Sequence, residues 1–229
     1  MAERTVIPEI PLRGGRTTAR VVRAGDTVRR PQDPQSPFVH RLLQGLAESG
    51  CAAAPRFLGI DERQREILSF IPGEVPSELG EFSGVQLDAA ARSLRALHDS
   101  TESLTLRGSS EVICHGDASP CNALFVGGLP VASIDFDAAY PGRRSGDLGY
   151  AAWLWLDIGS EDGAAPPQSQ RLARFFAAYG AEASIDPVQA VLDAQARLCA
   201  RPGGHPAWAQ RCRLWTEQHR LELGRAGPA

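Results

Sequence analysis

With 229 residues and a hydrophobic fraction of 43%, the chain is long enough to form one large domain or two small lobes around a substantial core. A net charge of -3 and a pI near 6.0 give no excess of positive charge for binding nucleic acid or an acidic membrane surface. The first residues, MAERTVIPEIPLRGG, lack the apolar run of a signal peptide, and no stretch is long and apolar enough for a membrane span. The five cysteines form no CxxC pair, which indicates reduced thiols and predicts a cytoplasmic protein.

The first part of the chain carries the signals of a small sheet with one helix. Alternating apolar residues predict strands, and Ala24-Gly25-Asp26 predicts a hairpin turn between the first two. The expected strands are residues 19–23, 26–30, 56–60 and 66–71. Ser36-Pro37 is typical of a helix start, an apolar face follows it, and Gly50 is expected to end the helix.

After Pro72-Gly73-Glu74 the pattern becomes mostly helical. The expected helices are residues 85–98, 149–156, 168–179, 187–200 and 207–223. The main exception is a hairpin over 123–136 with a turn at Gly127-Gly128, and GSEDGAAPPQSQ (159–170) is expected to be a loop. The sequence therefore predicts an α+β protein of two lobes, a strand-rich lobe over 1–71 and a helical lobe over 72–229, with a cleft between them that suits a ligand.

One loop and one hairpin carry the chemistry. In HGDASPCN (115–122), Asp117 and Asn122 have the spacing of the kinase catalytic loop D-x-x-x-x-N, and Asp135 follows in IDFD (134–137). Carboxylate and amide oxygens are hard ligands of the kind that Mg²⁺ prefers. Because the hairpin folds the chain back, Asn122 and Asp135 are expected to face one ion.

HGDASPCN together with IDFD resembles the aminoglycoside phosphotransferase family, which comprises small-molecule kinases of two-lobed protein-kinase-like fold. LRALHDS (94–100) and SFIPGE (69–74) resemble its Leu-His helix end and its inter-lobe connector. The resemblance implies Asp117 as catalytic base, His115 as a brace of the loop, and ATP or GTP as co-substrate. It also implies Asn122 and Asp135 as ligands of Mg²⁺.

Two further aspartates belong to this resemblance. Asp147, in SGDLGY, is similar to a family aspartate and is expected to be structural. Asp137 is expected to be either a supporting carboxylate or a solvated turn residue.

The nucleotide side departs from the kinase pattern because the chain contains no lysine, and all 24 of its basic residues are arginine. In kinases a strand lysine contacts the phosphates, and a residue two positions before it lies on the same face of the strand. Applied to TVRR (27–30), this spacing places Val28 over the adenine and Arg30 toward the phosphates, although both Arg29 and Arg30 could instead be solvated strand ends. The connector residues Phe70 and Ile71 complete the expected nucleotide contacts.

The glutamate that pairs with the kinase lysine is also absent from the expected helix. His40 or Gln44 occupies its region, Glu48 comes too late, and Asp33 is a possible substitute before the helix. The glycine-rich loop is reduced to RGG (13–15).

The acceptor pocket is expected in the helical lobe, where aromatic and acidic side chains would suit a cationic or sugar-like molecule, although helical tryptophans more often belong to the core. The candidates are Trp153, Trp155, Asp157, Glu161, Asp162 and Trp208. An antibiotic, an amino sugar and another metabolite all fit this pattern.

Two other functions fit the sequence. The missing lysine and glutamate favour a kinase-like nucleotide-binding or regulatory protein with little catalysis. A metal-dependent hydrolase built on His115, Asp117 and Asp135 is the third reading, although the remaining histidines form no HxH or HExxH spacing.

Overall fold

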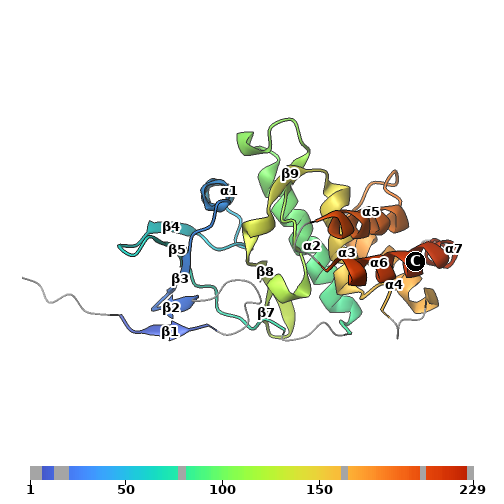
Figure 1. Ribbon diagram of the computed structural model, residues 1–229, viewed down its shortest axis with the longest axis horizontal. Helices are drawn as coiled ribbons and strands as arrows, with labels where there is room; N and C mark the ends of the chain where they lie inside the picture. Colours follow the sequence, from blue (N-terminus) through green and yellow to red (C-terminus); the bar gives the residue numbers. More distant parts are fainter. Residues whose placement is uncertain (1–6, 13–20, 77–80, 161–164, 202–204, 226–229) are drawn as a thin grey trace, which may run out of the picture.

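The computed structural model describes residues 7–12, 21–76, 81–160, 165–201 and 205–225. A strand-rich part lies at one end of the long axis and a helical part at the other, with small strands between them (Figure 1). This arrangement confirms the predicted α+β class. In the described ranges, no helix has both the length and the apolar character needed to cross a membrane.

A five-stranded antiparallel sheet, in the order β1-β2-β3-β5-β4, forms the first part. Its strands are β1 (Glu9–Pro11), β2 (Val22–Ala24), β3 (Thr27–Pro31), β4 (Phe57–Ile60) and β5 (Arg65–Ser69). The hairpin predicted at Gly25 joins β2 to β3. Strand β5 also pairs with β3, and in that register Arg30 lies directly opposite Glu66. The sheet therefore brings together two charged residues that are far apart in the sequence.

Helix α1 (Ser36–Glu48) packs against β4 and buries the apolar face that the sequence predicted. The side chain of Asp33 accepts hydrogen bonds from the backbone N–H groups of Gln35 and Ser36, both at 2.8 Å, and so satisfies the first turn. Asp33 therefore starts the helix, and the structure shows no bond from it to Arg30.

The helical part contains most of the remaining chain. Its helices are α2 (Gly84–Thr101), α3 (Arg144–Trp155), α4 (Ala165–Tyr179), α5 (Pro187–Ala200), α6 (Pro206–Gln218) and α7 (Arg220–Leu223). Helices α3 and α5 approach closely, since a Cβ added to Gly149 would lie 2.1 Å from the carbonyl oxygen of Ala190. This contact forms one wall of the site described below.

Several boundaries differ from the sequence prediction. Helix α2 ends at Thr101, beyond the expected 98, strand β5 ends at Ser69, before the expected 71, and three further differences concern helices. Helix α3 begins at residue 144, five residues early, because its polar first turn is buried through Asp147 and offers no apolar signal. Helix α4 begins at residue 165, inside the loop expected over 159–170, and prolines are compatible with the first turn of a helix. The helix expected over 207–223 is divided at His219.

Two small antiparallel sheets carry the motif residues. They are β6 (Val112–Cys114) with β9 (Tyr140–Gly142), and β7 (Ala123–Val126) with β8 (Leu129–Ser133). Short 3₁₀ turns lie at η1 (Thr105–Arg107), η2 (Pro120–Asn122) and η3 (Phe136–Ala138). The loop 115–122 thus runs from β6 to β7, and Asp135 lies between β8 and η3. The hairpin predicted over 123–136 is confirmed by the β7–β8 pair.

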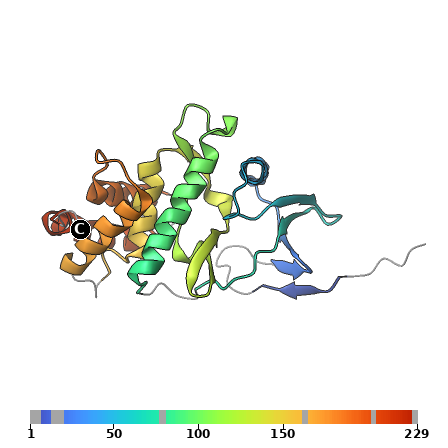
Figure 2. The same ribbon diagram turned by 180° about the vertical axis from the view of Figure 1, so that it is seen from behind.

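Backbone hydrogen bonds join the two parts of the molecule, whose ribbon is seen from behind in Figure 2. The connector residue Glu74 exchanges N–H···O bonds of 2.9 and 2.8 Å with Phe125 of β7. The N–H of Ser133 donates to the carbonyl of Ala53 at 2.8 Å. The β7–β8 hairpin is therefore bonded both to the connector and to the strand-rich part.

Candidate active site

The loop 115–122 has a backbone that requires glycine at its second position. Gly116 has a φ of +78°, and a Cβ placed on it would lie 2.0 Å from the carbonyl oxygen of Ala138. Next to it, His115 is fully buried, its Nε2–H donates to the carbonyl of Ile134 at 3.0 Å, and its Nδ1 accepts the N–H of Asp117 at 3.3 Å. The imidazole therefore joins this loop to the segment that carries Asp135.

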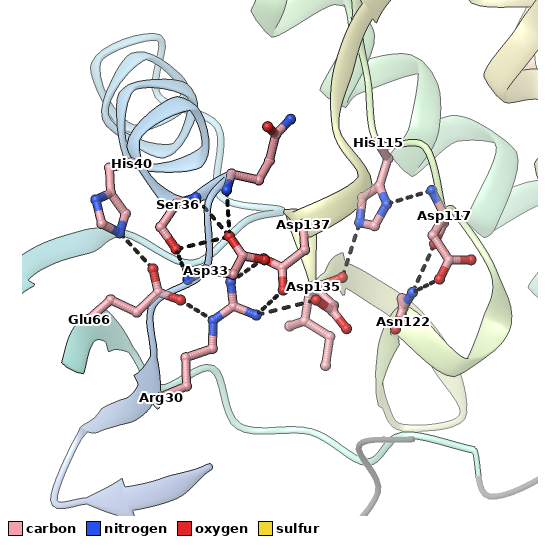
Figure 3. Close-up of polar contacts among 12 residues, drawn as sticks. Arg30, Asp33, Ser36, His40, Glu66, His115, Asp117, Asn122, Asp135 and Asp137 are labelled. Carbon is pink, nitrogen blue, oxygen red and sulfur yellow. Dashed lines mark hydrogen bonds and ion pairs between the residues drawn. The ribbon is translucent and has the colours of Figure 1, made fainter. Parts of the chain in front are cut away.

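Asp117 is half-buried and lies between two hydrogen-bond donors. The hydroxyl of Tyr150 donates to its Oδ1 at 2.8 Å. On the other side, the side-chain amide of Asn122 donates to its Oδ2 at 2.9 Å (Figure 3). The same amide nitrogen also donates to the Asp117 carbonyl at 3.0 Å. Burial raises the pKa of Tyr150, and the negative charge of Asp117 raises it further, so this hydroxyl stays protonated and donates.

Beneath the loop, Asp147 acts as a buried acceptor for three N–H groups. Its carboxylate accepts the backbone N–H of His115 at 2.7 Å and of Gly116 at 3.0 Å, and Nε2–H of His98 at 3.0 Å. Burial alone would raise the pKa of Asp147, but the hydrogen bond and charge of His98 and the contacts of His115 outweigh it and lower that pKa. Asp147 therefore supports the loop from below, in agreement with the structural role expected from the sequence.

The structure also clarifies the surroundings of His98. Its Nδ1 lies 2.7 Å from the hydroxyl of Tyr179, which in turn accepts from Arg144 at 3.1 Å. Within the described residues, His98, Cys114 and Asp147 are the cluster whose ligand atoms lie close enough together for a metal. The hydrogen bond between His98 and Asp147 already uses two of these groups, so the cluster reads as a structural brace.

Asp135 and Asp137 face the strand-rich part and meet Arg30 there. Asp135 has a φ of +64°, a left-handed conformation that turns the chain sharply after β8. The Arg30 guanidinium lies 3.3 Å from Asp135 Oδ1 and bonds both oxygens of Asp137, one of them at 3.0 Å (Figure 3). Asp137 therefore forms an ion pair with Arg30, so it is not a freely solvated turn residue.

Arg30 has a second set of partners within its own sheet. Its Nε donates to Glu66, which is fully buried and lies 2.6 Å from His40 Nε2 (Figure 3). Burial lowers the pKa of Arg30, but the Asp137 hydrogen bond and the charges of Glu66 and both aspartates outweigh it and raise that pKa. Burial raises the pKa of Asp137, the Arg30 contacts oppose this, and the charge of Asp135 adds to it.

The carboxylate that pairs with Arg30 thus comes from β5, whereas the sequence analysis considered positions in helix α1 and just before it. His40, one of the helix positions considered, contacts that carboxylate and stacks on Phe57 at 3.8 Å between ring centroids. A usable signal was present, because the alternation in β5 puts Glu66 on the same buried face as Leu68. An acidic residue on a buried strand face predicts a paired charge.

The remaining predicted nucleotide contacts lie around β3. Arg29 points to the other face of the strand from Arg30, where its Nε lies 3.9 Å from Asp61. Val28 is half-buried on the same face as Arg30. Phe70 and Ile71 follow β5. The guanidinium of Arg23 lies over the Phe70 ring, 3.8 Å from its centroid. The segment RGG (13–15) lies outside the described residues.

Among the described residues expected in the acceptor pocket, Trp155 contacts the loop 115–122, because its Nε1–H donates to the carbonyl of Ala118 at 3.2 Å. Trp153 and Trp155 are core residues, 1% and 4% exposed, and Trp153 stacks on Trp208. Glu161 and Asp162 lie outside the described residues, and Asp157 is half-buried at the end of α3. Trp153 thus packs toward α6 through Trp208, whereas the Trp155 ring packs on Phe82 and Phe125.

A strand-rich part, a helical part, a D-x-x-x-x-N loop and an aspartate after a hairpin together define a two-lobed protein-kinase-like fold. The family model described as "Phosphotransferase enzyme family" matches residues 101–190, the segment that contains the loop, the hairpin and Asp147. The resemblance to the aminoglycoside phosphotransferase family that HGDASPCN and IDFD predict is therefore confirmed.

Known relatives agree with this fold. The trifolitoxin immunity protein of Rhizobium leguminosarum bv. trifolii is 38% identical over 165 residues, which cover 65% of this chain and 62% of the relative. The match thus spans less than two thirds of that relative. A choline/ethanolamine kinase family protein of Mesorhizobium loti superposes with a TM-score of 0.59 at 16% identity, over 96% of this chain and 93% of the other. An aminoglycoside phosphotransferase of Streptomyces rimosus, in complex with ADP and streptomycin, gives 0.55 at 14% identity, over 86% and 90%.

Proposed function

We propose that this protein is a phosphotransferase that moves the γ-phosphoryl group of ATP or GTP to a hydroxyl group of a small molecule. The observation that carries the proposal is the arrangement around Asp117, whose carboxylate is oriented by Tyr150 and Asn122. A carboxylate oriented in this way suits an acceptor hydroxyl better than a solvated turn residue would.

In the proposed reaction Asp117 is the base. The acceptor hydroxyl oxygen forms a bond to the γ-phosphorus, the bond from that phosphorus to the bridging oxygen breaks, and the nucleoside diphosphate leaves. The hydroxyl proton passes to Asp117. Because phosphoryl transfer depends mainly on positioning and charge stabilisation, the hydrogen bonds that orient Asp117 are part of the mechanism. His115 acts as the brace between this loop and Ile134 and takes no proton.

The residues proposed to bind Mg²⁺ are Asn122 and Asp135, and their chemistry fits that ion. The Asp135 side chain is 36% exposed and offers hard carboxylate oxygens. The amide nitrogen of Asn122 is engaged by Asp117, which leaves its Oδ1 as the ligand atom. The N–H of Ile134 donates to the carbonyl of Asn122 at 2.9 Å, which keeps the two segments together. When bound, the ion would neutralise charge on the β- and γ-phosphates.

On the nucleotide side, Arg30 is proposed to replace the kinase lysine. Its guanidinium faces the two aspartates of IDFD, whereas Arg29 faces Asp61 on the opposite side of the sheet. A guanidinium binds phosphate oxygens bidentately and stays charged at all working pH values. Val28, Phe70 and Ile71 are proposed to contact the base, as the sequence pattern predicts, and Arg29 to support the strand.

Binding of the metal–nucleotide would require Arg30 to exchange partners. In the structure Arg30 bonds Asp135 and Asp137 and keeps Glu66 as an anchor. We expect the guanidinium to release Asp135 to the ion and to turn toward the phosphates while it remains bonded to Glu66.

The proposal also assigns a role to each lobe and a cellular location to the protein. Residues 1–71 would form the nucleotide-binding lobe and residues 72–229 the catalytic and acceptor-binding lobe, in a cytoplasmic protein with a nucleotide and a small molecule as its partners.

A kinase-like nucleotide-binding or regulatory protein with little catalysis is the second candidate. The observation that favours it is the bond between Arg30 and Asp135, which engages the aspartate that the metal would need. Calorimetry with Mg-ATP and Mg-GTP separates the two functions, because binding without acceptor-dependent turnover supports the second.

The decisive experiment measures nucleoside diphosphate release in the presence of Mg²⁺, ATP or GTP and a panel of hydroxyl acceptors. Asp117→Asn is expected to lower transfer by at least about 100-fold while nucleotide binding stays unchanged. Asp135→Asn is expected to weaken Mg-nucleotide binding itself. Asp88→Asn, on α2 in an ion pair with Arg174 of α4, is the matched control and should change neither quantity. Full activity of Asp117→Asn would exclude the proposed mechanism.

A further inference from the structure

A cavity of about 390 Å³ lies beside the loop 115–122, between the start of α3, the end of α5 and β9. The side chains that determine its chemistry are Tyr140, Asp147, Tyr150, Arg197 and Arg201. Its volume falls in the range of roughly 300–1,000 Å³ that is usual for pockets that bind small molecules.

The cavity adjoins the proposed base. Gly116, which precedes Asp117, is part of its wall, and so is Tyr150, whose hydroxyl donates to Asp117 at 2.8 Å. A molecule that fills this cavity therefore contacts Gly116 and the Tyr150 side chain that donates to the Asp117 carboxylate. Asp157, the described acidic residue among those that the sequence suggested for the acceptor, does not line it.

The charged groups that line the cavity leave it positive. Among the described residues that line the cavity, Asp147 is the one carboxylate, and it is buried and engaged by three N–H donors. Arg197 donates to the carbonyl of Gly146 at 2.5 Å, which leaves its charge uncompensated. In the described part of the chain, neither Arg197 nor Arg201 forms an ion pair with a carboxylate, and both residues are exposed.

The fields of both arginines reach the cavity wall. Burial raises the pKa of Tyr140 and of Tyr150; the charge of Arg197 opposes this shift at Tyr140, and that of Arg201 opposes it at Tyr150. Two uncompensated guanidinium groups therefore act on one cavity in a chain whose net charge is -3. A cationic ligand would be repelled there, whereas an oxyanion would receive charge-assisted hydrogen bonds.

We propose that the acceptor of this protein is an anionic alcohol, a hydroxyl compound whose carboxylate or phosphate group is bound by Arg201 and Arg197 while its hydroxyl reaches Asp117. This inference rests on the proposed function, because it assigns the cavity to the acceptor. It differs from the cationic or sugar-like acceptor that the aromatic and acidic residues of the sequence suggest.

The test uses four sugars that share a hydroxyl-bearing ring and differ in charge: glucosamine, glucose, glucuronate and glucose 6-phosphate. Binding to the full chain is measured by titration calorimetry, and phosphoryl transfer from Mg-ATP is then measured with each sugar. At least one of the two anionic sugars is expected to bind about tenfold or more tightly than glucosamine, since a hydrogen bond to a charged group contributes that much. A preference for glucuronate or for glucose 6-phosphate identifies the carboxylate or the phosphate as the recognised group.

Substitutions assign the effect to the arginines. Arg201→Gln is expected to abolish the anion preference, and Arg201→Lys to retain part of it, with Mg-nucleotide binding unchanged in both. Arg213→Gln, at an exposed arginine of α6 that pairs with Glu217, is the matched control and should leave the preference intact. Equal binding of all four sugars, tighter binding of glucosamine, binding of none, or an unchanged preference in Arg201→Gln overturns the inference.

The acceptor inference and the proposed function can fail independently of each other. Loss of Mg-nucleotide binding in Asp135→Asn tests the kinase assignment without any acceptor. If nucleotide turnover is absent while anion binding depends on Arg201, the phosphotransferase proposal fails and the anion-binding cavity remains. If nucleotide binding behaves as expected and the sugars show no charge preference, the acceptor inference alone fails.

Discussion

Arg30→Met should destabilise the protein strongly, because it leaves a buried carboxylate without its cation. The Glu66 side chain is 0% exposed, and its remaining polar partner in the structure would be His40 at 2.6 Å. Removing one member of a buried ion pair typically costs about 3–5 kcal/mol. In addition, Asp135 and Asp137 would lose the positive charge that offsets the repulsion between their carboxylates.

The expected shift is large enough to measure by urea and thermal unfolding, with tryptophan fluorescence as the signal. For a chain of this size, about 3–5 kcal/mol corresponds to a decrease in melting temperature of roughly 6–20 °C. Arg95→Met is the matched control, because Arg95 forms an ion pair with Asp99 at 2.8 Å in which both side chains are more than 40% exposed. That variant should lose no more than about 0.5 kcal/mol.

A double-mutant cycle isolates the pair. Glu66→Gln removes the buried charge but retains a hydrogen-bonding group for His40, so Arg30→Met combined with Glu66→Gln should be more stable than additivity predicts, by about 2–3 kcal/mol. If Arg30→Met is as stable as Arg95→Met, or if the two substitutions are additive, the charge network around Glu66 has been misassigned.

Three further expectations concern the loop and its supports. Tyr150→Phe removes the hydroxyl that donates to Asp117 and should lower kcat by about tenfold or more, with KM for the nucleotide unchanged; a change confined to KM would contradict a positioning role. Gly116→Ala should cost at least about 2 kcal/mol in unfolding free energy, because its Cβ would lie 2.0 Å from the carbonyl oxygen of Ala138 at a φ of +78°; wild-type stability would show that the loop relaxes freely. Since the pKa of Asp147 is lowered by folding from 3.8, its contribution is fully present above that pH and is lost as the pH falls below it. Unfolding measured against pH should therefore show an acid limb that flattens in Asp147→Asn, and an unchanged limb would contradict this assignment.

The local motifs could be predicted because their geometry is local. HGDASPCN and IDFD are joined by a hairpin whose glycine turn is visible in the sequence, so the proximity of Asn122 and Asp135 follows from a short stretch of chain. The helices were predicted where an apolar face is regular. The first turn of α3 was not predicted because it is polar and gives no apolar signal. Its buried residue, Asp147, is stabilised instead by hydrogen bonds from residues 98, 115 and 116.

The partners of Arg30 could not be predicted, because they depend on long-range strand pairing. The cross-strand pair of Arg30 and Glu66 exists only because β5 lies between β3 and β4, an order that no turn signal specifies. The cavity beside the loop 115–122 also depends on long-range contacts, since Tyr150 of α3 and Arg201 at the end of α5 meet through helix packing. The sequence alone could not decide between an acceptor role and a core role for the tryptophans, because large aromatic rings suit both.

The arginine at position 30 also changes which reagents can detect this protein. Nucleotide probes that acylate the active-site amine of kinases depend on a lysine that becomes a nucleophile, and a guanidinium remains protonated and does not react in this way. Because the sequence contains no lysine side chain, such a probe would leave no covalent label on a lysine, and acetylation or ubiquitination of lysine side chains could not control the protein. Surveys based on amine chemistry would therefore overlook a kinase-like site of this kind, whereas arginine-directed dicarbonyl reagents, with protection by nucleotide, would reveal it.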